Sequence, residues 1–356
     1  MSRSRKPGRT AAARAARLLG LATLAASTSA AVSASDAVGA APSYHFDRPA
    51  AIAAAGGRLW IANRDGNSVT MAGAGGAPLG VLAAAKYRFG RPDAIAAAGG
   101  RVWVLSRAGR VTELRASNGA LVRVVRGSRY RLHDPVAITV AGADVVVASR
   151  SSNTVTVIDA ATGDLVRVVS NHTASGLRLD HPIALAVHAG TVWVANQGGS
   201  VSAFRLATGT FVRRVAAKAD GFATPAGIAY AGGRIWVSDQ ASNAVTELRT
   251  DGKLVQVITN SSNNANYGFD GPTVVAGHGK QVFVVSPPGS SPMVTKVETK
   301  TADGDWYECN TNKPNPHFAN PTGLAFLGTH IWVVSPANNS LAELHYSTGA
   351  LIKRFV

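Results

Sequence analysis

Short apolar runs separated by glycine and polar turns recur along the chain from residue 44 to residue 356. The third recurrence has its apolar runs at 136–140, 145–148, 154–158 and 165–169. Runs of about five residues, rich in Val and Ile and joined by tight turns, are typical of antiparallel strands. No amphipathic stretch of helical length separates them, which disfavours βαβ units and α-solenoids. The pattern therefore predicts repeated units of four short strands.

A proline marks the same point in each of seven units. These prolines are Pro49, Pro92, Pro135, Pro182, Pro225, Pro272 and Pro321, separated by 43 to 49 residues. Eleven residues after a proline stand five of the six tryptophans, namely Trp60, Trp103, Trp193, Trp236 and Trp332. A fixed period in this range indicates a solenoid or a propeller.

The segments around these tryptophans, such as 59–61 and 192–194, are apolar at consecutive positions. Successive side chains of a strand point to opposite faces, so these strands are expected to be buried on both faces. Blades packed face to face around an axis provide that environment. We predict an all-β fold, a seven-bladed β-propeller with four antiparallel strands per blade, over residues 41–356. The last run, 351–356, completes the seventh unit, so the last blade should close on the first without a sheet shared by both termini.

The segment 147–163, with the sequence VASRSSNTVTVIDAATG, resembles the YVTN-type β-propeller repeat of secreted and surface proteins. The Pro-x-x-Ile-Ala opening of several units resembles NHL repeats. The resemblance covers residues 44–356 and implies the propeller fold, but a fold of this kind carries little about function. Streptogramin-lyase-type propellers share the overall repeat, and their second strand typically continues aromatic-Phe-Thr-Glu. Here the matching residues are Trp60-Ile61-Ala62-Asn63, so the acid of that family is not carried over.

The first 40 residues have a different composition. Residues 2–17 are basic, residues 18–26 form a short apolar run, and small residues follow to position 40. This order is that of a secretory signal peptide, although a basic, alanine-rich disordered tail is an alternative. We therefore expect a secreted protein, extracellular or associated with the cell surface. No run reaches the length of a bilayer-spanning helix, so no transmembrane segment is expected.

Composition narrows the functional classes. The chain has 356 residues, with 36 Lys+Arg against 20 Asp+Glu and a net charge of +16. A hydrophobic content of 46% with only 16% charged residues excludes a disordered or coiled-coil chain. The single cysteine excludes an internal disulfide framework. The basic charge permits nucleic-acid binding. The predicted signal peptide and the lack of a basic run interleaved with aromatic residues nevertheless lead us to expect no nucleic-acid partner. We expect a monomer without a cofactor.

The loop before the first strand and the loop between the second and third strands should emerge on one face, which carries the longer, more variable loops. Ligand sites favour such loops on a rigid scaffold. Fifteen residues after five of the prolines, at the start of the second of these loops, stand Arg64, Arg107, Arg150, Gln197 and Gln240. Arginine forks suit carboxylate, phosphate or sulfate groups. We predict that these residues bind a partner protein, an anionic glycan or a small molecule; the alternative is that they are solvated rim residues.

A second group precedes the third and fourth prolines. It consists of His133, Asp134, Asp180 and His181. Histidine and aspartate are reasonable ligands for a divalent ion. The alternative is that an aspartate before a first strand only holds a turn. A His/Asp site here would favour a propeller lyase or hydrolase over a binding protein.

Three glutamates, Glu113, Glu247 and Glu343, recur at one position of third strands. We interpret them as solvent-facing strand positions rather than acid catalysts. No nucleophile elbow and no phosphate-binding glycine-rich loop occurs in the sequence. The leading hypothesis is thus a secreted, non-enzymatic propeller that binds a partner or an anionic ligand on its loop-rich face.

Overall fold

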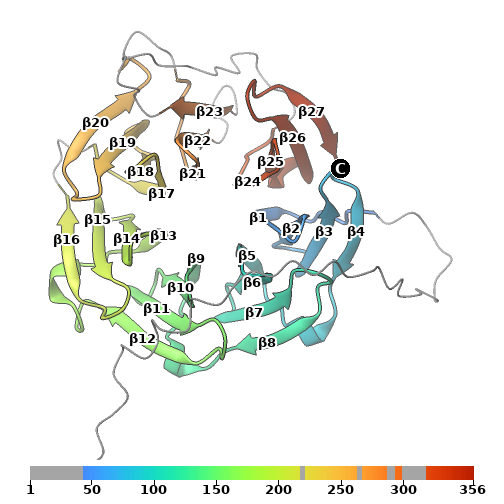
Figure 1. Cartoon of the computed structure of the whole chain (residues 1–356), viewed down its shortest axis with the longest axis horizontal. Coiled ribbons are helices and arrows are strands. Elements are labelled where there is room, and N and C mark those ends of the chain that lie inside the picture. Colours follow the sequence, from blue (N-terminus) through green and yellow to red (C-terminus); the bar gives the residue numbers. More distant parts are fainter. Residues whose placement is uncertain (1–42, 217–220, 263–266, 287–292, 299–317) are drawn as a thin grey trace, which may run out of the picture. The chain divides into compact units, whose positions relative to one another are not determined.

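The computed structural model describes residues 43–216, 221–262, 267–286, 293–298 and 318–356. Its strands form seven antiparallel sheets arranged as blades around a common centre (Figure 1). The predicted seven-bladed β-propeller is confirmed. The predicted leader of residues 1–40 and Cys309 lie outside the described residues.

Within each blade the strands are hydrogen-bonded in chain order, and the first strand lies nearest the centre (Figure 1). Blade 1 contains β1 (Pro49–Ala55), β2 (Arg58–Asn63), β3 (Ser68–Gly73) and β4 (Pro78–Leu82). Blade 2 contains β5 (Pro92–Ala98), β6 (Arg101–Ser106), β7 (Arg110–Arg115) and β8 (Leu121–Val125). Blade 3 contains β9 (Pro135–Ala141), β10 (Asp144–Ser149), β11 (Thr154–Asp159) and β12 (Leu165–Ser170). Blade 4 contains β13 (Pro182–His188), β14 (Thr191–Asn196), β15 (Ser200–Arg205) and β16 (Phe211–Val215).

The remaining blades follow the same plan. Blade 5 contains β17 (Pro225–Ala231), β18 (Arg234–Asp239), β19 (Ala244–Arg249) and β20 (Leu254–Thr259). Blade 6 contains, within the described residues, β21 (Val274–His278), β22 (Gln281–Ser286) and β23 (Met293–Glu298). Blade 7 contains β24 (Gly323–Leu327), β25 (His330–Ser335), β26 (Ser340–His345) and β27 (Leu351–Phe355). The described helices are single 3-10 turns at η1 (Ala85–Tyr87), η2 (Ser128–Tyr130), η3 (Ser175–Leu177) and η6 (Pro336–Asn338).

The second strand of a blade is buried on both faces because each face meets a different neighbour. Trp60 packs in the cluster shared with blade 2, whereas Leu59 and Ile61 pack in the cluster shared with blade 7. All three side chains are 0% exposed. Because successive side chains of a strand point to opposite faces, one apolar run of the second strand packs against both neighbouring blades.

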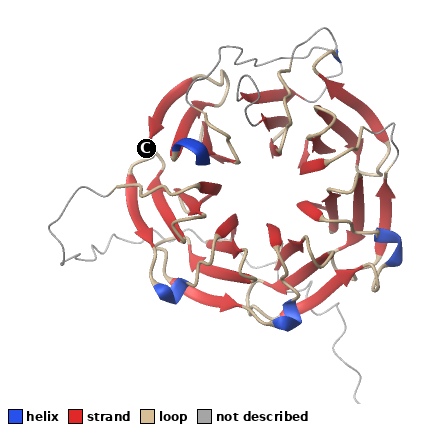
Figure 2. Ribbon diagram, turned by 180° about the vertical axis from the view of Figure 1, so that it is seen from behind, coloured by secondary structure: helices blue, strands red, loops and turns tan. Residues whose placement is uncertain are grey.

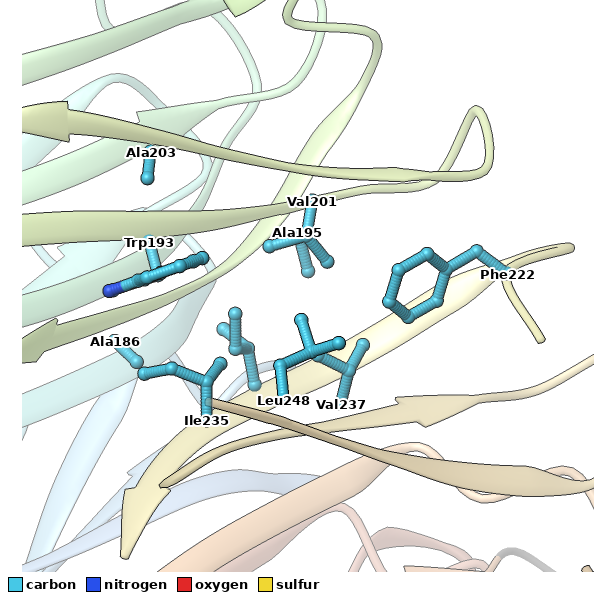
Figure 3. Close-up of a cluster of buried hydrophobic side chains, with 10 residues drawn as sticks. Ala186, Trp193, Ala195, Val201, Ala203, Phe222, Ile235, Val237 and Leu248 are labelled. Atoms are coloured by element: carbon cyan, nitrogen blue, oxygen red, sulfur yellow. The ribbon is translucent and has the colours of Figure 1, made fainter. Parts of the chain in front are cut away.

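Seven hydrophobic clusters of described residues lie between successive blades, one at each junction. Between blades 4 and 5, Trp193 lies near Ile235 and Ala186, while Leu248 and Val237 continue the cluster toward Phe222 (Figure 3). Full burial of an aliphatic side chain contributes roughly 1.5–3 kcal/mol. The junctions, rather than a single central core, therefore hold the ring together.

The linkers that enter the blades are fixed above the third strands by a repeated hydrogen bond. Thr112 of β7 donates from Oγ1 to the carbonyl of Tyr87 at 2.7 Å, and Thr156 of β11 donates likewise to Tyr130 at 2.7 Å. Both tyrosine rings are buried. These contacts make the linkers, and so the loop-rich face, part of the rigid scaffold.

The ring closes between blade 7 and blade 1. No strand of the last sheet belongs to the first, which confirms the predicted closure. The backbone N–H of Arg48 donates to Asn339 Oδ1 at 2.8 Å, and the Phe355 ring meets Tyr44 at a centroid distance of 5.6 Å. Phe355 also joins the buried cluster around Trp332. Packing and hydrogen bonding thus replace the covalent linker present at the other junctions.

The interpretation of the three glutamates as solvent-facing was wrong. Glu113, Glu247 and Glu343 are only 2%, 4% and 6% exposed. Glu113 pairs across the strand with Trp103, so the two side chains share the face that blade 3 covers. Its carboxylate meets Arg123 Nε at 2.8 Å and Arg101 Nε at 3.1 Å. Burial raises the pKa of Glu113, and the two guanidinium groups oppose that rise.

Candidate ligand-binding site

A cavity of about 380 Å³ opens at the centre of the loop-rich face. All seven blades contribute to its wall, which places it on the axis of the ring. Its lining includes all five residues of the predicted binding group, Arg64, Arg107, Arg150, Gln197 and Gln240. The rest of the wall is made largely by the residues that follow the repeat prolines. A second hollow, of about 500 Å³, involves only blade 1 and the segment before it.

Three arginines on one side of the cavity, Arg64, Arg107 and Arg150, form what we call the inner arginine arc. Two aspartates hold it. Asp93 of β5 pairs with Arg64 of blade 1 and also with Arg107 Nε of its own blade at 2.6 Å. Asp134 accepts from Arg150 Nη2 at 2.7 Å and from Arg150 Nε at 2.9 Å. Arg107 Nη1 also lies 3.9 Å from Asp134. The three arginines and two aspartates therefore form one continuous row of contacts in which positive and negative side chains alternate.

The inner arginine arc keeps a positive excess of one charge, because three arginines face two aspartates. The Asp93 side chain is 6% exposed, whereas those of Arg64 and Arg107 are 24% and 36% exposed. The hydrogen bond to Asp93 raises the pKa of Arg107, so this group stays charged. A guanidinium has five N–H donors, and the aspartates engage only two nitrogens of each. Donors therefore remain for a ligand in the cavity.

The opposite side of the cavity is uncharged and mixes polar residues with apolar ones such as Ile183 and Val274. It carries Gln197 and Gln240 together with Thr224, Thr273 and Thr322. Amide and hydroxyl groups both donate and accept hydrogen bonds. The wall thus suits a molecule that is anionic at one end and hydroxylated or amide-bearing at the other.

The four residues considered as metal ligands are not brought together. Asp134 is engaged by Arg150, and Asp180 meets the neighbouring His181 Nδ1 at 2.8 Å. The side chains of Asp180 and His181 are 53% and 58% exposed, and His133 is exposed as well. Over the described part of the chain, no three His, Cys, Asp or Glu side chains are grouped as a metal site would require. The structure instead gives Asp134 the role of positioning an arginine.

Asp93 is the site residue that the sequence reasoning missed. The residue after each repeat proline lines the cavity in every blade, namely Ala50, Asp93, Val136, Ile183, Ala226, Thr273 and Thr322. Asp93 is the charged member of this set. The other six residues at this repeat position are small or apolar. The exception at Asp93 is the sequence signal that could have identified it as a site residue.

Comparison with known proteins supports a propeller-repeat family. The family model described as outer membrane protein assembly factor BamB matches residues 49–221, which is less than half of the chain. The naming of the repeats as YVTN or NHL is not confirmed by this match. No curated protein is significantly similar to the chain in sequence.

Several solved structures have the same fold. Streptogramin B lyase superposes with a TM-score of 0.64 at 14% identity, covering 82% of this chain and 91% of the lyase chain. Hydrazine synthase from Kuenenia stuttgartiensis gives 0.66 at 16% identity, covering 88% and 99%. A catalytically inactive virginiamycin B lyase from Staphylococcus aureus, with quinupristin, gives 0.64 at 15% identity, covering 83% and 94%. At these identities the likeness shows the fold alone.

The described residues contain no helix long and apolar enough to cross a bilayer.

Proposed function

We propose that this protein is a non-enzymatic binding module that holds a small carboxylate-bearing molecule in the axial cavity. The observation that carries the proposal is the inner arginine arc, whose three guanidinium groups are positioned by Asp93 and Asp134 and keep a net positive charge at the cavity wall. Positioned arginines recognise carboxylates through paired, charge-assisted hydrogen bonds. A volume of about 380 Å³ lies in the range of small-molecule sites.

A catalytic role has less support. The two lyases share the fold with this chain, but fold alone does not carry chemistry. No histidine is found among the described residues that line the cavity. The His133, Asp134, Asp180 and His181 group does not converge on one point either. Binding without turnover therefore accounts better for the wall as it is built.

Isothermal titration calorimetry with citrate and glucuronate, and with glucose as a neutral control, tests the proposal. Arg107→Gln should weaken binding of the anions by about tenfold to a hundredfold, because a charge-assisted hydrogen bond contributes roughly 1.5–3 kcal/mol. Asp134→Asn should strengthen it, since the variant raises the positive excess of the arc. Arg115→Gln, an exposed arginine at the end of β7 on the opposite face, is the matched control and should change nothing.

Two results would contradict this function. One is the absence of binding heat with either anion at millimolar concentration. The other is equal affinity in wild type and Arg107→Gln, which would mean that the anions bind elsewhere.

The proposal includes export from the cytoplasm, supported by the basic, apolar and small-residue order of residues 1–40. Mass spectrometry of protein recovered from the culture medium of an expressing bacterium should show a new N-terminus between residues 29 and 41. Protein that stays in the cells and still begins at Met1 would argue for a retained tail.

A further inference from the structure

A second set of arginines lies on the same face, outside the axial cavity. Each linker that enters blades 1 to 6 has a residue in the left-handed region four positions before the repeat proline. Five of these linkers have a second such residue directly before the proline, at Arg48, Arg91, Asp134, His181 and Gly271. At the first of these positions, blades 1 to 6 have His45, Arg88, Arg131, Arg178, Gly221 and Gly268, with φ of 44°, 53°, 49°, 46°, 74° and 64°. Three consecutive blades therefore carry arginine at this first position. We call Arg88, Arg131 and Arg178 the outer arginine arc.

The backbone at this position favours glycine. A side chain in the left-handed region places its β-carbon close to the carbonyl oxygen, at a cost of roughly 1–2 kcal/mol. Blades 5 and 6 avoid this cost with Gly221 and Gly268. Strained residues of this kind persist mainly where they serve a function. The arginines in blades 2 to 4 are thus not explained by the needs of the turn.

The side chains of the outer arginine arc are exposed. Within the described residues none of the three forms an ion pair, in contrast to the inner arc. Each arginine directly follows one of the 3-10 turns η1, η2 and η3. These turns lie toward the outer edge of the ring (Figure 2). Further exposed cations, Lys86 and Arg126, lie on the same linkers.

We propose that the outer arginine arc docks an extended acidic polysaccharide, with its sulfate or carboxylate groups spanning blades 2 to 4. One arginine per blade, at the same position in three neighbours, presents regularly repeated positive charge. A polymer with a regularly repeated anion matches this arrangement, whereas a small anion would engage a single blade. Each guanidinium can bind a sulfate or carboxylate through a fork of two hydrogen bonds.

Two other classes of polyanion fit the surface less well. Single-stranded nucleic acid is bound by stacking on exposed aromatic rings, but Tyr87, Phe89 and Tyr130 of these linkers are buried. A membrane surface is bound by cations together with exposed apolar side chains. The exposed large apolar residues of the described chain are Leu79, Phe211, Leu254, Val255, Ile352 and Val356. They lie on fourth strands and at the C-terminus, not on the linkers.

The test compares two triple variants of equal charge. The first is Arg88→Gly, Arg131→Gly and Arg178→Gly, which the left-handed backbone accepts. The matched control is Arg115→Gln, Arg205→Gln and Arg249→Gln, three exposed arginines that end third strands on the opposite face. Affinity for dextran sulfate is measured over a series of salt concentrations, with duplex DNA and phosphatidylglycerol vesicles as further probes.

Wild type should bind dextran sulfate more tightly than DNA or vesicles. The glycine variant should lose about tenfold or more in affinity, with a shallower dependence on salt because fewer counterions are released. The control should lose less than about threefold, which is the effect of a lower net charge alone. Equal losses of affinity in both variants would show that the outer arginine arc is not the binding surface. Tighter binding of DNA or vesicles than of dextran sulfate would show that an acidic polysaccharide is not the ligand. Citrate and glucuronate should bind the glycine variant with the same affinity as wild type. The proposals for the axial cavity and for the outer arginine arc are therefore tested separately.

Discussion

The two arginine arcs lie on one face of one ring and are built in opposite ways. In the inner arc the side chains are held by Asp93 and Asp134, and much of their charge is neutralised. In the outer arc the side chains are exposed, and it is the backbone of Arg88, Arg131 and Arg178 that is constrained. The same residue type is therefore a positioned donor in one place and an exposed charge in the other.

The inner arc is suited to bind a ligand through positioned hydrogen-bond donors, whereas the outer arc is suited to bind one through exposed positive charge. A positioned guanidinium loses little side-chain entropy when a ligand arrives, so it suits a small molecule that must be recognised in one orientation. An exposed guanidinium pays that entropy on binding and suits a polymer with many weak contacts. Substitutions in the two arcs should therefore change the stability of the protein in different directions.

The largest expected effect is at Asp93. Asp93→Ala removes the shared partner of Arg64 and Arg107, and leaves two guanidinium groups facing each other across the junction of blades 1 and 2. Breaking a buried ion pair costs roughly 3–5 kcal/mol, and the partial exposure of both arginines reduces this to about 2–3 kcal/mol. The measurement is the free energy of unfolding in urea at fixed ionic strength, because an uncharged denaturant does not screen the ion pairs.

The control for Asp93→Ala is built into the repeat. Blade 1 has Ala50 at the same position, so the backbone accepts alanine there. Adding Arg107→Gln to Asp93→Ala should recover part of the loss, because one of the two unpaired charges is then gone. A double variant that loses the sum of both single effects would show that the ion pairs do not couple.

The repeat made most of the fold predictable. Proline and tryptophan recur at fixed offsets, and an apolar second strand implies neighbours on both faces, which together indicate stacked blades in a closed ring. Burial at third-strand positions was harder to predict. Glu113 is polar in sequence, yet it shares a face with Trp103 and is covered by blade 3. A glutamate in a sequence is usually expected to face solvent, but a carboxylate paired with two arginines can be buried.

The candidate site was only half predictable. The common offset of Arg64, Arg107 and Arg150 predicted that they share one arc of the loop-rich face, and the structure places all three in the wall of the axial cavity. Their pairing with Asp93 and Asp134 depends on side-chain reach between neighbouring blades, which spacing along the chain does not specify. The outer arc depends on a left-handed φ at each linker, and arginine gives no sequence signal for that conformation as glycine does.

Single glycine substitutions, one in each arc, should have the smallest effects on stability. Arg131→Gly should leave the free energy of unfolding unchanged within about 0.5 kcal/mol or raise it by up to 1 kcal/mol, because relief of left-handed strain offsets the greater entropy of glycine in the unfolded chain. Arg150→Gly should lower it by about 1–2 kcal/mol, since the hydrogen bonds to Asp134 are lost and no strain is relieved. Urea unfolding of both variants and wild type measures the difference. If Arg131→Gly destabilises the protein as much as Arg150→Gly, then Arg131 serves the fold rather than an exposed binding surface, and the contrast between the arcs does not hold.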